Sequence, residues 1–121
     1  MSSTEQIRRT RRRHQRIEVL APIGARLLDL EVSGQLRDVS EGGFSLGTDE
    51  PVSLDVPHLV LFTLADGWST VLLACARHEG PGHDCAHVTG FEFADADDSM
   101  TRQAIAELLD HVTVLAAPSA D

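Results

Sequence analysis

The sequence predicts a mainly β protein, a six-stranded antiparallel β-barrel followed by one C-terminal α-helix. From Ile17 onward, short apolar stretches alternate with turn residues at intervals of roughly 8 to 12 residues, a spacing typical of barrels and sandwiches. No helical period separates these stretches, which argues against alternating strands and helices. A helical pattern is present only after residue 98. A closed barrel is favoured because it leaves no exposed strand edges.

Six apolar stretches form the predicted strands. Residues that favour chain reversal bound them, including the Gly42–Gly43 pair, Asp66–Gly67 and Gly80–Pro81–Gly82. The strands are expected at residues 21–29, 34–39, 43–47, 58–64, 69–78 and 86–94.

One helix is expected over residues 99–115, where apolar residues recur at helical spacing. Asp97, Asp98 and Ser99 offer side-chain oxygens that can cap its first turn. The polar face carries acids and hardly any bases, unlike helices that lie on membranes. We therefore expect the helix to cover the barrel through an apolar stripe of Ile105, Leu108, Leu109 and Val112.

The length of 121 residues suits one compact domain. Residues 1–16 contain six Arg and a single large apolar side chain, Ile7, so they cannot bury enough surface to offset the entropy of ordering. The sequence therefore divides into a flexible Arg-rich arm at 1–16 that carries half of a binding site, a barrel with its helix at 17–115, and a tail at 116–121.

Charge is distributed unevenly along the chain. Six of the ten basic residues lie between positions 8 and 16, whereas residues 17–121 contain eighteen acids and four Arg. An acidic body repels phosphate, which argues against general coating of nucleic acid. The pattern favours a partner that is held where the arm meets the body.

The sequence favours a cytoplasmic protein without membrane insertion. No apolar run reaches the ~18 residues of a membrane span, and no apolar segment follows the basic N-terminus as it does in a secretory signal. Cys75 and Cys85 are two thiols in a domain large enough to fold without disulfides, so reduced, partly buried cysteines are expected.

Two short segments together predict an anion-binding site. Arg12 and Arg16 stand four residues apart, immediately before the chain enters the barrel, and can face one object. Asp38, Ser40 and Gly43 follow at the turn between two predicted strands. Arginine forks supply fixed donors for phosphates and guanine edges, and the turn supplies a carboxylate, a hydroxyl and backbone amides.

The order and spacing of these residues resemble the PilZ domain family, receptors for the bacterial second messenger cyclic di-GMP. The family pattern is Arg-x-x-x-Arg, then about twenty to thirty residues, then Asp/Asn-x-Ser-x-x-Gly on a six-stranded barrel with a C-terminal helix. In this chain, twenty-one residues separate Arg16 from Asp38, and Ser40 and Gly43 complete the pattern. The segment 90–93, Gly-Phe-Glu-Phe, is similar to the closing strand of the family.

The resemblance implies that Arg12 and Arg16 clamp guanine edges and phosphates. Arg11, just before the pair, is the kind of residue that accompanies a self-stacked ligand dimer in this family. Arginine pairs with O6 and N7 of guanine, so the chemistry of the ligand agrees with this role.

On the barrel side, the resemblance implies that Asp38 and Ser40 bind a guanine and neighbouring polar atoms, while Gly43 lets the backbone come close. A carboxylate can accept hydrogen bonds from N1 and N2 of guanine. The implied protein is a receptor that needs no cofactor or metal, does not turn its ligand over and is not an enzyme. Binding would change the conformation of the arm and signal to a downstream protein that the sequence does not identify.

Two other patterns resemble chemical sites. His78, His83, Cys85 and His87 lie within ten residues and suggest zinc, but no matched ligand pair comes from another element. Residues 43–47, Gly-Phe-Ser-Leu-Gly, match the nucleophile elbow of hydrolases, but an elbow needs a helix next and Pro51 follows instead. Neither pattern is preferred over the nucleotide site.

Two alternative functions remain open from the sequence. A PilZ-like adaptor without ligand would act through protein contacts alone, and a nucleic-acid-binding arm would use its arginines on phosphates. The first predicts no binding of cyclic di-GMP. The second predicts an affinity for DNA or RNA that falls steeply with salt and ignores Asp38.

Overall fold

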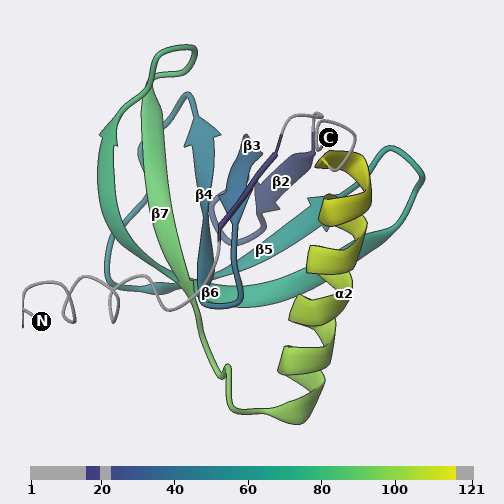
Figure 1. Cartoon of the computed structure of the whole chain (residues 1–121). Coiled ribbons are helices and arrows are strands. Elements are labelled where there is room, and N and C mark those ends of the chain that lie inside the picture. The colour runs from purple at the N-terminus through teal and green to yellow at the C-terminus, as the bar shows by residue number, and fades with distance from the viewer. Residues whose placement is uncertain (1–15, 20–22, 117–121) are drawn as a thin grey trace, which may run out of the picture.

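The computed structural model describes residues 16–19 and 23–116. The predicted arm, apart from Arg16, and the predicted tail beyond residue 116 lie outside the described residues. Within these described residues, seven strands and one helix follow one another (Figure 1). They are β1 (Ile17–Glu18), β2 (Gly24–Leu27), β3 (Val32–Val39), β4 (Gly43–Thr48), β5 (Pro57–Thr63), β6 (Ser69–Pro81), β7 (His87–Phe93) and α2 (Ser99–Ala116).

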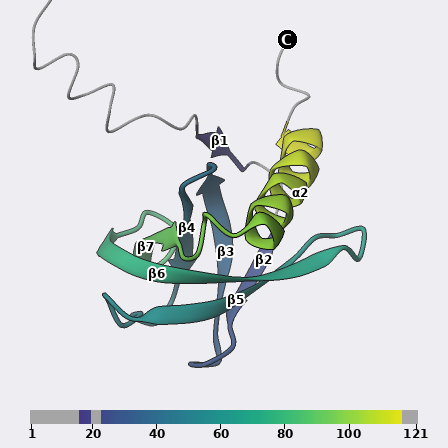
Figure 2. The same cartoon turned by 90° about the horizontal axis from the view of Figure 1, so that it is seen from below.

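The predicted six-stranded antiparallel barrel with a C-terminal helix is confirmed. Strands β2 to β7 are hydrogen-bonded in the order β3-β2-β5-β6-β7-β4, and a further pairing between β3 and β4 closes the ring. The two-residue strand β1 is an addition to this barrel, and it pairs with the end of β3 (Figure 2). The sequence did not predict β1 because two residues are too few to show a period.

The interior of the barrel is filled by alternate residues of the strands, because successive side chains of a strand point to opposite faces. All four phenylalanines of the chain meet there around Phe44. The ring of Phe44 stacks on Phe91 at 4.7 Å between centroids and meets Phe62 edge-on at 5.0 Å, and Phe93 lies 5.2 Å away. This cluster supports the inner side of the turn that contains Gly43.

The helix packs against the barrel as the sequence predicts. Ile105, Leu108 and Val112 are buried in the barrel's core cluster, with Leu109 packed against it. Helix α2 contacts β6 and β1, so it lies beside the strand that follows Arg16 (Figure 2). Within the described part of the chain, no helix has both the length and the apolar character that crossing a bilayer requires.

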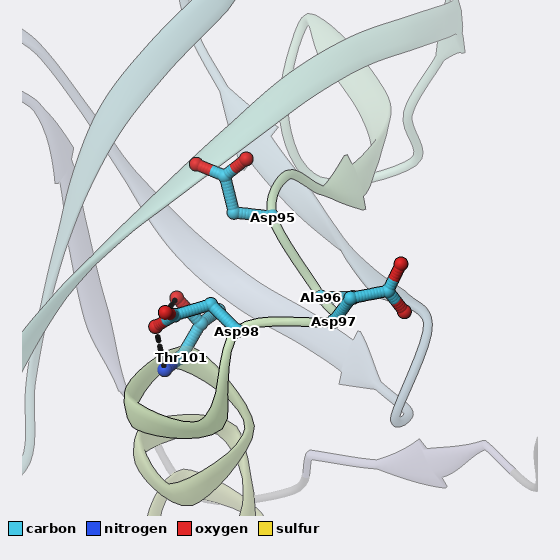
Figure 3. Close-up of a pocket in the computed structure, with 5 residues that line it drawn as sticks. All are labelled: Asp95, Ala96, Asp97, Asp98 and Thr101. Atoms are coloured by element: carbon cyan, nitrogen blue, oxygen red, sulfur yellow. Dashed lines mark hydrogen bonds between the residues drawn. The ribbon is translucent and has the colours of Figure 1, made fainter.

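The first turn of α2 is capped by Asp98, one of the three predicted capping residues. Its Oδ2 accepts hydrogen bonds from the backbone N–H of Thr101 at 3.0 Å and from the Thr101 hydroxyl at 3.3 Å. Figure 3 shows Asp98 turned toward Thr101, while the carboxylates of Asp95 and Asp97 point elsewhere. The hollow that these residues line is therefore a capping structure, and its acids would repel an anionic ligand.

The buried hydroxyl of Thr89 provides a first prediction. Thr89 is fully buried, and its Oγ1 has no hydrogen-bond partner among the described residues. Replacing Thr89 with valine removes this uncompensated polar atom and keeps the shape, so we expect the free energy of unfolding to rise by about 1 kcal/mol in urea titrations.

Thr48→Val is the matched control for this change. Thr48 is equally buried at 2% exposure, but its hydroxyl donates a 2.7 Å hydrogen bond to the carbonyl of Glu50. The same substitution there should lower the free energy of unfolding by about 1 kcal/mol. Equal effects of the two substitutions would contradict the prediction.

Candidate functional site

A bulge in β3 turns Asp38 to the outside of the barrel. The register against β4 runs from Leu36 opposite Leu46 to Asp38 opposite Ser45, so Arg37 is an extra residue. Without the bulge, strict alternation from the buried Leu36 would point Asp38 inward and Val39 outward. In the structure Val39 is fully buried, and the side chain of Asp38 is 27% exposed. This bulge was not predicted from the sequence, although two adjacent polar residues between Leu36 and Val39 break the alternation and could have indicated it.

The turn after Asp38 is tied together by Ser40. The backbone N–H of Ser40 donates to the carbonyl of Gly43 at 2.8 Å, and the N–H of Gly42 donates to the Ser40 hydroxyl at 3.2 Å. The hydroxyl itself lies 3.4 Å from the Gly43 carbonyl and can donate to it. Ser40 is 9% exposed, so in this conformation it shapes the turn. A direct contact between Ser40 and a ligand stays a prediction.

Gly43 occupies a place that no other residue fits. A Cβ built at this position would overlap the carbonyl oxygen of Phe91 and lie 3.1 Å from its carbon, and both atoms belong to the backbone of the neighbouring strand β7. The turn is also fixed to β7 by a 3.0 Å hydrogen bond from the N–H of Phe93 to the carbonyl of Gly42. The glycine thus allows the turn that follows Asp38 to lie tightly on the sheet.

Replacing Gly43 with alanine should therefore destabilise the fold. Because the clash is with backbone, either β4 or β7 must move, and we expect the free energy of unfolding to fall by about 2 kcal/mol in urea titrations. Gly80→Ala is the control, since a Cβ at Gly80 has no neighbour within 4 Å. A Gly43→Ala protein as stable as Gly80→Ala would show that the backbone of the turn can shift freely.

The pairing of β1 with β3 brings Arg16 to Asp38. Ile17 lies opposite Val39 and Glu18 opposite Asp38, and the N–H of Val19 donates to the carbonyl of Arg37 at 2.9 Å. Arg16 directly precedes this pairing, and its Nη1 is 3.6 Å from Oδ2 of Asp38. The Arg16 side chain is 67% exposed, so the ion pair contributes little to stability. It can be exchanged for a ligand at small cost.

The structure thus brings together four of the predicted site residues, Arg16, Asp38, Ser40 and Gly43. The other two, Arg11 and Arg12, lie outside the described residues. Arg16 and Asp38 offer a guanidinium and a carboxylate side by side on the outer face, next to a turn that is held rigidly. This pair supplies donors for phosphate or guanine O6 and N7, and an acceptor for guanine N1 and N2.

Arg37, which the sequence analysis did not single out, lies next to the site on the same bulge. Its Nη1 donates a 2.8 Å hydrogen bond to Oδ1 of Asp84 in the β6–β7 hairpin. The hydrogen bond with Asp84 raises the pKa of Arg37, and the same bond lowers the pKa of the Asp84 carboxyl. Arg37 therefore forms its ion pair with the hairpin, and among the described residues Arg16 forms the ion pair with Asp38.

The histidine and cysteine cluster does not form a metal site in the described part of the chain. His87 pairs with Glu79, and the thiol of Cys85 donates to the carbonyl of His87 at 3.3 Å. Within residues 16–19 and 23–116, no group of three or more His, Cys, Asp or Glu is placed to hold a metal ion. Both Cys75 and Cys85 are free and half-buried.

The pattern that matches a nucleophile elbow lies on a regular strand. Residues 43–48 form β4 without a break, and Ser45 lies in its middle, opposite Asp38 on one side and Gly90 on the other. An elbow requires a sharp turn between a strand and a helix at the serine. Ser45 is therefore part of the outer sheet surface.

Several solved structures have the same architecture. YcgR from Escherichia coli in complex with c-di-GMP matches with a TM-score of 0.71 and 16% identity, over 92% of this chain and 50% of the YcgR chain. The isolated PilZ domain of YcgR with c-di-GMP matches with a TM-score of 0.69 and 15% identity, over 92% of this chain and 98% of that domain. The chain therefore spans about half the length of the YcgR chain that it matches.

A third structure, the PilZ domain of CeSA from a cellulose-synthesizing bacterium, is 24% identical over 80% of this chain and 96% of that domain, with a TM-score of 0.59. At these identities the structures establish the fold alone. No match was found among curated protein sequences. The model of the PilZ domain family matches residues 10–111, which include both Arg12 and Arg16 and the whole segment from Asp38 to Gly43. The chain belongs to the PilZ domain family.

Proposed function

We propose that this domain is a receptor for cyclic di-GMP, which it binds on the outer face of the barrel without turning it over. The observation that carries the proposal is the ion pair of Arg16 and Asp38 beside the Ser40 turn. In this ion pair an arginine of the family's Arg-x-x-x-Arg motif meets the aspartate of its Asp-x-Ser-x-x-Gly motif. The similar structures of YcgR and of its PilZ domain contain c-di-GMP, which supports the same ligand here.

In the proposed complex each residue has a separate part. Arg12 and Arg16 bind guanine edges and phosphates, and Arg11 assists if the ligand is a stacked dimer. Asp38 releases Arg16 to the ligand and accepts from guanine N1 and N2. The exchange replaces an exposed ion pair by two charge-assisted contacts, which are stronger than neutral hydrogen bonds.

The remaining two residues act through the backbone and the turn. Ser40 and Gly43 keep the β3–β4 turn close to the sheet, so that ligand atoms can approach the turn beside Asp38. The site holds its ligand by binding contacts alone, and no step of this function is catalytic.

Isothermal titration of cyclic di-GMP into the wild-type protein and Arg12→Ala tests this function. We expect saturable binding by the wild type and a loss of about tenfold or more in affinity for the variant, because one bidentate guanine contact is worth ~1–3 kcal/mol. Arg102→Ala, an equal change at an exposed position of α2, should bind like the wild type. A wild-type protein that ignores the nucleotide at high micromolar concentration would refute the proposal.

We also propose that binding changes the conformation of residues 8–16 and that a downstream protein reads this change. Saturating ligand should then slow amide hydrogen exchange in this segment. If ligand binds but hydrogen exchange in residues 8–16 is unchanged, signalling through the arm is refuted. Ligand binding itself would still be supported.

A further inference from the structure

The outer face of strands β2, β5 and β6 carries a continuous apolar patch. Strands β5 and β6 lie side by side, with Leu59 opposite Leu73 and Leu61 opposite Val71 (Figure 2). Leu28 extends the patch onto the neighbouring side, since its N–H donates to the carbonyl of Leu59 at 2.9 Å. Leu28, Leu59 and Val71 are 40%, 46% and 47% exposed. These five aliphatic residues are called the apolar patch below.

The strands under the apolar patch are apolar on both faces. In an antiparallel strand with one face in water, apolar inward residues alternate with polar outward ones. Strand β3 follows this rule, with Ser33 and Gln35 exposed on its outer face. Residues 71–76 of β6, Val-Leu-Leu-Ala-Cys-Ala, instead form the uninterrupted apolar run that is typical of a strand covered on both sides. Helix α2 packs against the inner side only, because Leu108 shares the core with Leu72. The outer side is therefore suited to contact with another molecule.

Charges of opposite sign border the apolar patch on its two sides. Arg26 of β2 lies opposite Leu61 and is exposed. At the other border, the residue after β7 donates its N–H to the carbonyl of Leu73 at 2.9 Å, so the exposed Asp95 and Asp97 follow directly beside β6. In the described part of the chain, none of these three charged side chains has a partner. Three strand spacings, about 14 Å, separate β2 from β7, so Arg26 does not reach the two acids of its own chain.

We infer that the apolar patch binds a second copy of this chain in a two-fold symmetric dimer, with the axis running along and between β5 and β6. In such an interface the same surface of both copies meets, and each contact occurs twice. Rotation about this axis places each position of β5 against the matching position of β6 in the other copy. Leu59 then packs on the partner's Leu73, and Leu61 on the partner's Val71.

The charged borders are complementary under the same rotation. Strands β2 and β7 are the outer neighbours of β5 and β6, so the axis brings β2 of one copy to β7 of the other. Arg26 therefore faces Asp95 and Asp97 of the second copy. An apolar centre with complementary charges at its rim is the usual anatomy of a protein interface. This match of the surface with itself is what selects a second copy as the occupant.

The dimer is expected to be weak and to dissociate on dilution. A stable interface of standard size uses about 20–30 residues and ~800 Å² on each side, and the apolar patch supplies only its centre. The net charge of −9 per chain also repels a second copy. Strands β3 and β4, which carry the proposed ligand site, lie across the ring from β5 and β6. Dimerisation therefore leaves that site accessible, and the inference does not rest on the proposed function.

Sedimentation equilibrium from low to high micromolar concentration tests the dimer. The mass of the wild-type particle should rise from one chain toward two. Leu59→Glu places a carboxylate against an apolar partner surface twice per dimer, so the dissociation constant should increase about 100-fold or more. Gln35→Glu is the matched control, because it adds the same charge to an exposed position of β3 across the ring, and it should dimerise like the wild type. Thermal unfolding of each variant verifies that it is folded.

Charge reversal tests the orientation of the two copies. Arg26→Glu turns two attractive contacts into repulsive ones and should raise the dissociation constant about tenfold. Adding Asp97→Arg to the same chain should restore it to within about threefold of the wild type, because opposite charges face each other again. Asp97 is the acid to exchange, since Asp95 has a φ of 57° and Asp98 caps α2.

A wild-type protein that stays monomeric at high micromolar concentration would overturn the inference and leave the apolar patch to a different protein. A dimer that Leu59→Glu does not weaken would also overturn it, since the contact would then lie elsewhere on the surface. Failure of Asp97→Arg to rescue Arg26→Glu would contradict the two-fold arrangement. The titrations of cyclic di-GMP are separate from these measurements, so the proposed function would stand in each of the three cases.

Discussion

Asp38→Ala is expected to reduce the affinity for cyclic di-GMP about 100-fold, because the carboxylate faces outward on the barrel side of the site and can accept from both N1 and N2 of guanine. The bulge at Arg37 aims this side chain outward, and Arg16 lies 3.6 Å from it. Isothermal titration measures the loss. Arg16 also loses its partner in this variant, so part of the effect reflects a guanidinium that is no longer positioned.

The stability of Asp38→Ala distinguishes loss of binding from loss of fold. Asp38 is part of an exposed ion pair, so its removal should change the free energy of unfolding by less than about 0.5 kcal/mol. Asp49→Ala, which removes an exposed acid from the loop after β4, should leave both affinity and stability unchanged. Binding to nucleic acid that ignores Asp38→Ala and falls steeply with salt would instead favour the arginine-arm alternative.

Phe44→Ala should have the largest effect on the fold, lowering the free energy of unfolding by about 4 kcal/mol. Phe44 is 4% exposed and contacts the three other phenylalanines of the chain, so the truncation leaves a cavity at the centre of the cluster. Domains of this size have a total free energy of unfolding of about 5–15 kcal/mol, so this substitution would remove a large part of it. Chemical denaturation followed by circular dichroism measures the change.

Phe44→Leu provides the control for the Phe44 prediction, because it keeps most of the buried volume. We expect it to cost about 1 to 2 kcal/mol. A small effect of Phe44→Ala, similar to that of Phe44→Leu, would mean that the barrel collapses onto the vacated space. In that case Phe44 would not be the centre of the core, in contradiction to the ring contacts.

Most of the fold could be predicted because its signals are local. The turn residues at Gly42 and Gly43 and at Asp66 and Gly67 mark reversals that the structure places between β3 and β4 and between β5 and β6. The helix is likewise a local pattern, with its cap at Asp98. Strand ends were less predictable: β6 continues to Pro81, three residues beyond the predicted end at His78, because its pairing with β7 extends the hairpin.

The candidate site was predicted only in part, because only some of its signals are local in the sequence. The spacing from Arg16 to Asp38, Ser40 and Gly43 is a property of the sequence, and it was sufficient to indicate the family. The hydrogen bond of Arg37 to Asp84 and the overlap that any Cβ at Gly43 would make with Phe91 involve residues 47 and 48 positions apart. A single sequence does not encode such pairs in any local pattern.

The amino-acid sequence by itself determined the β-barrel class, the C-terminal helix and the residue types of the ligand motif, because periodicity, turn chemistry and motif spacing act between near neighbours. The tertiary structure alone decided that Asp38 faces outward and that β1 carries Arg16 to it. These features depend on strand register and on the bulge at Arg37. Register is fixed by how distant strands pair around a closed barrel, and a shift of one residue would turn every one of these side chains to the opposite face.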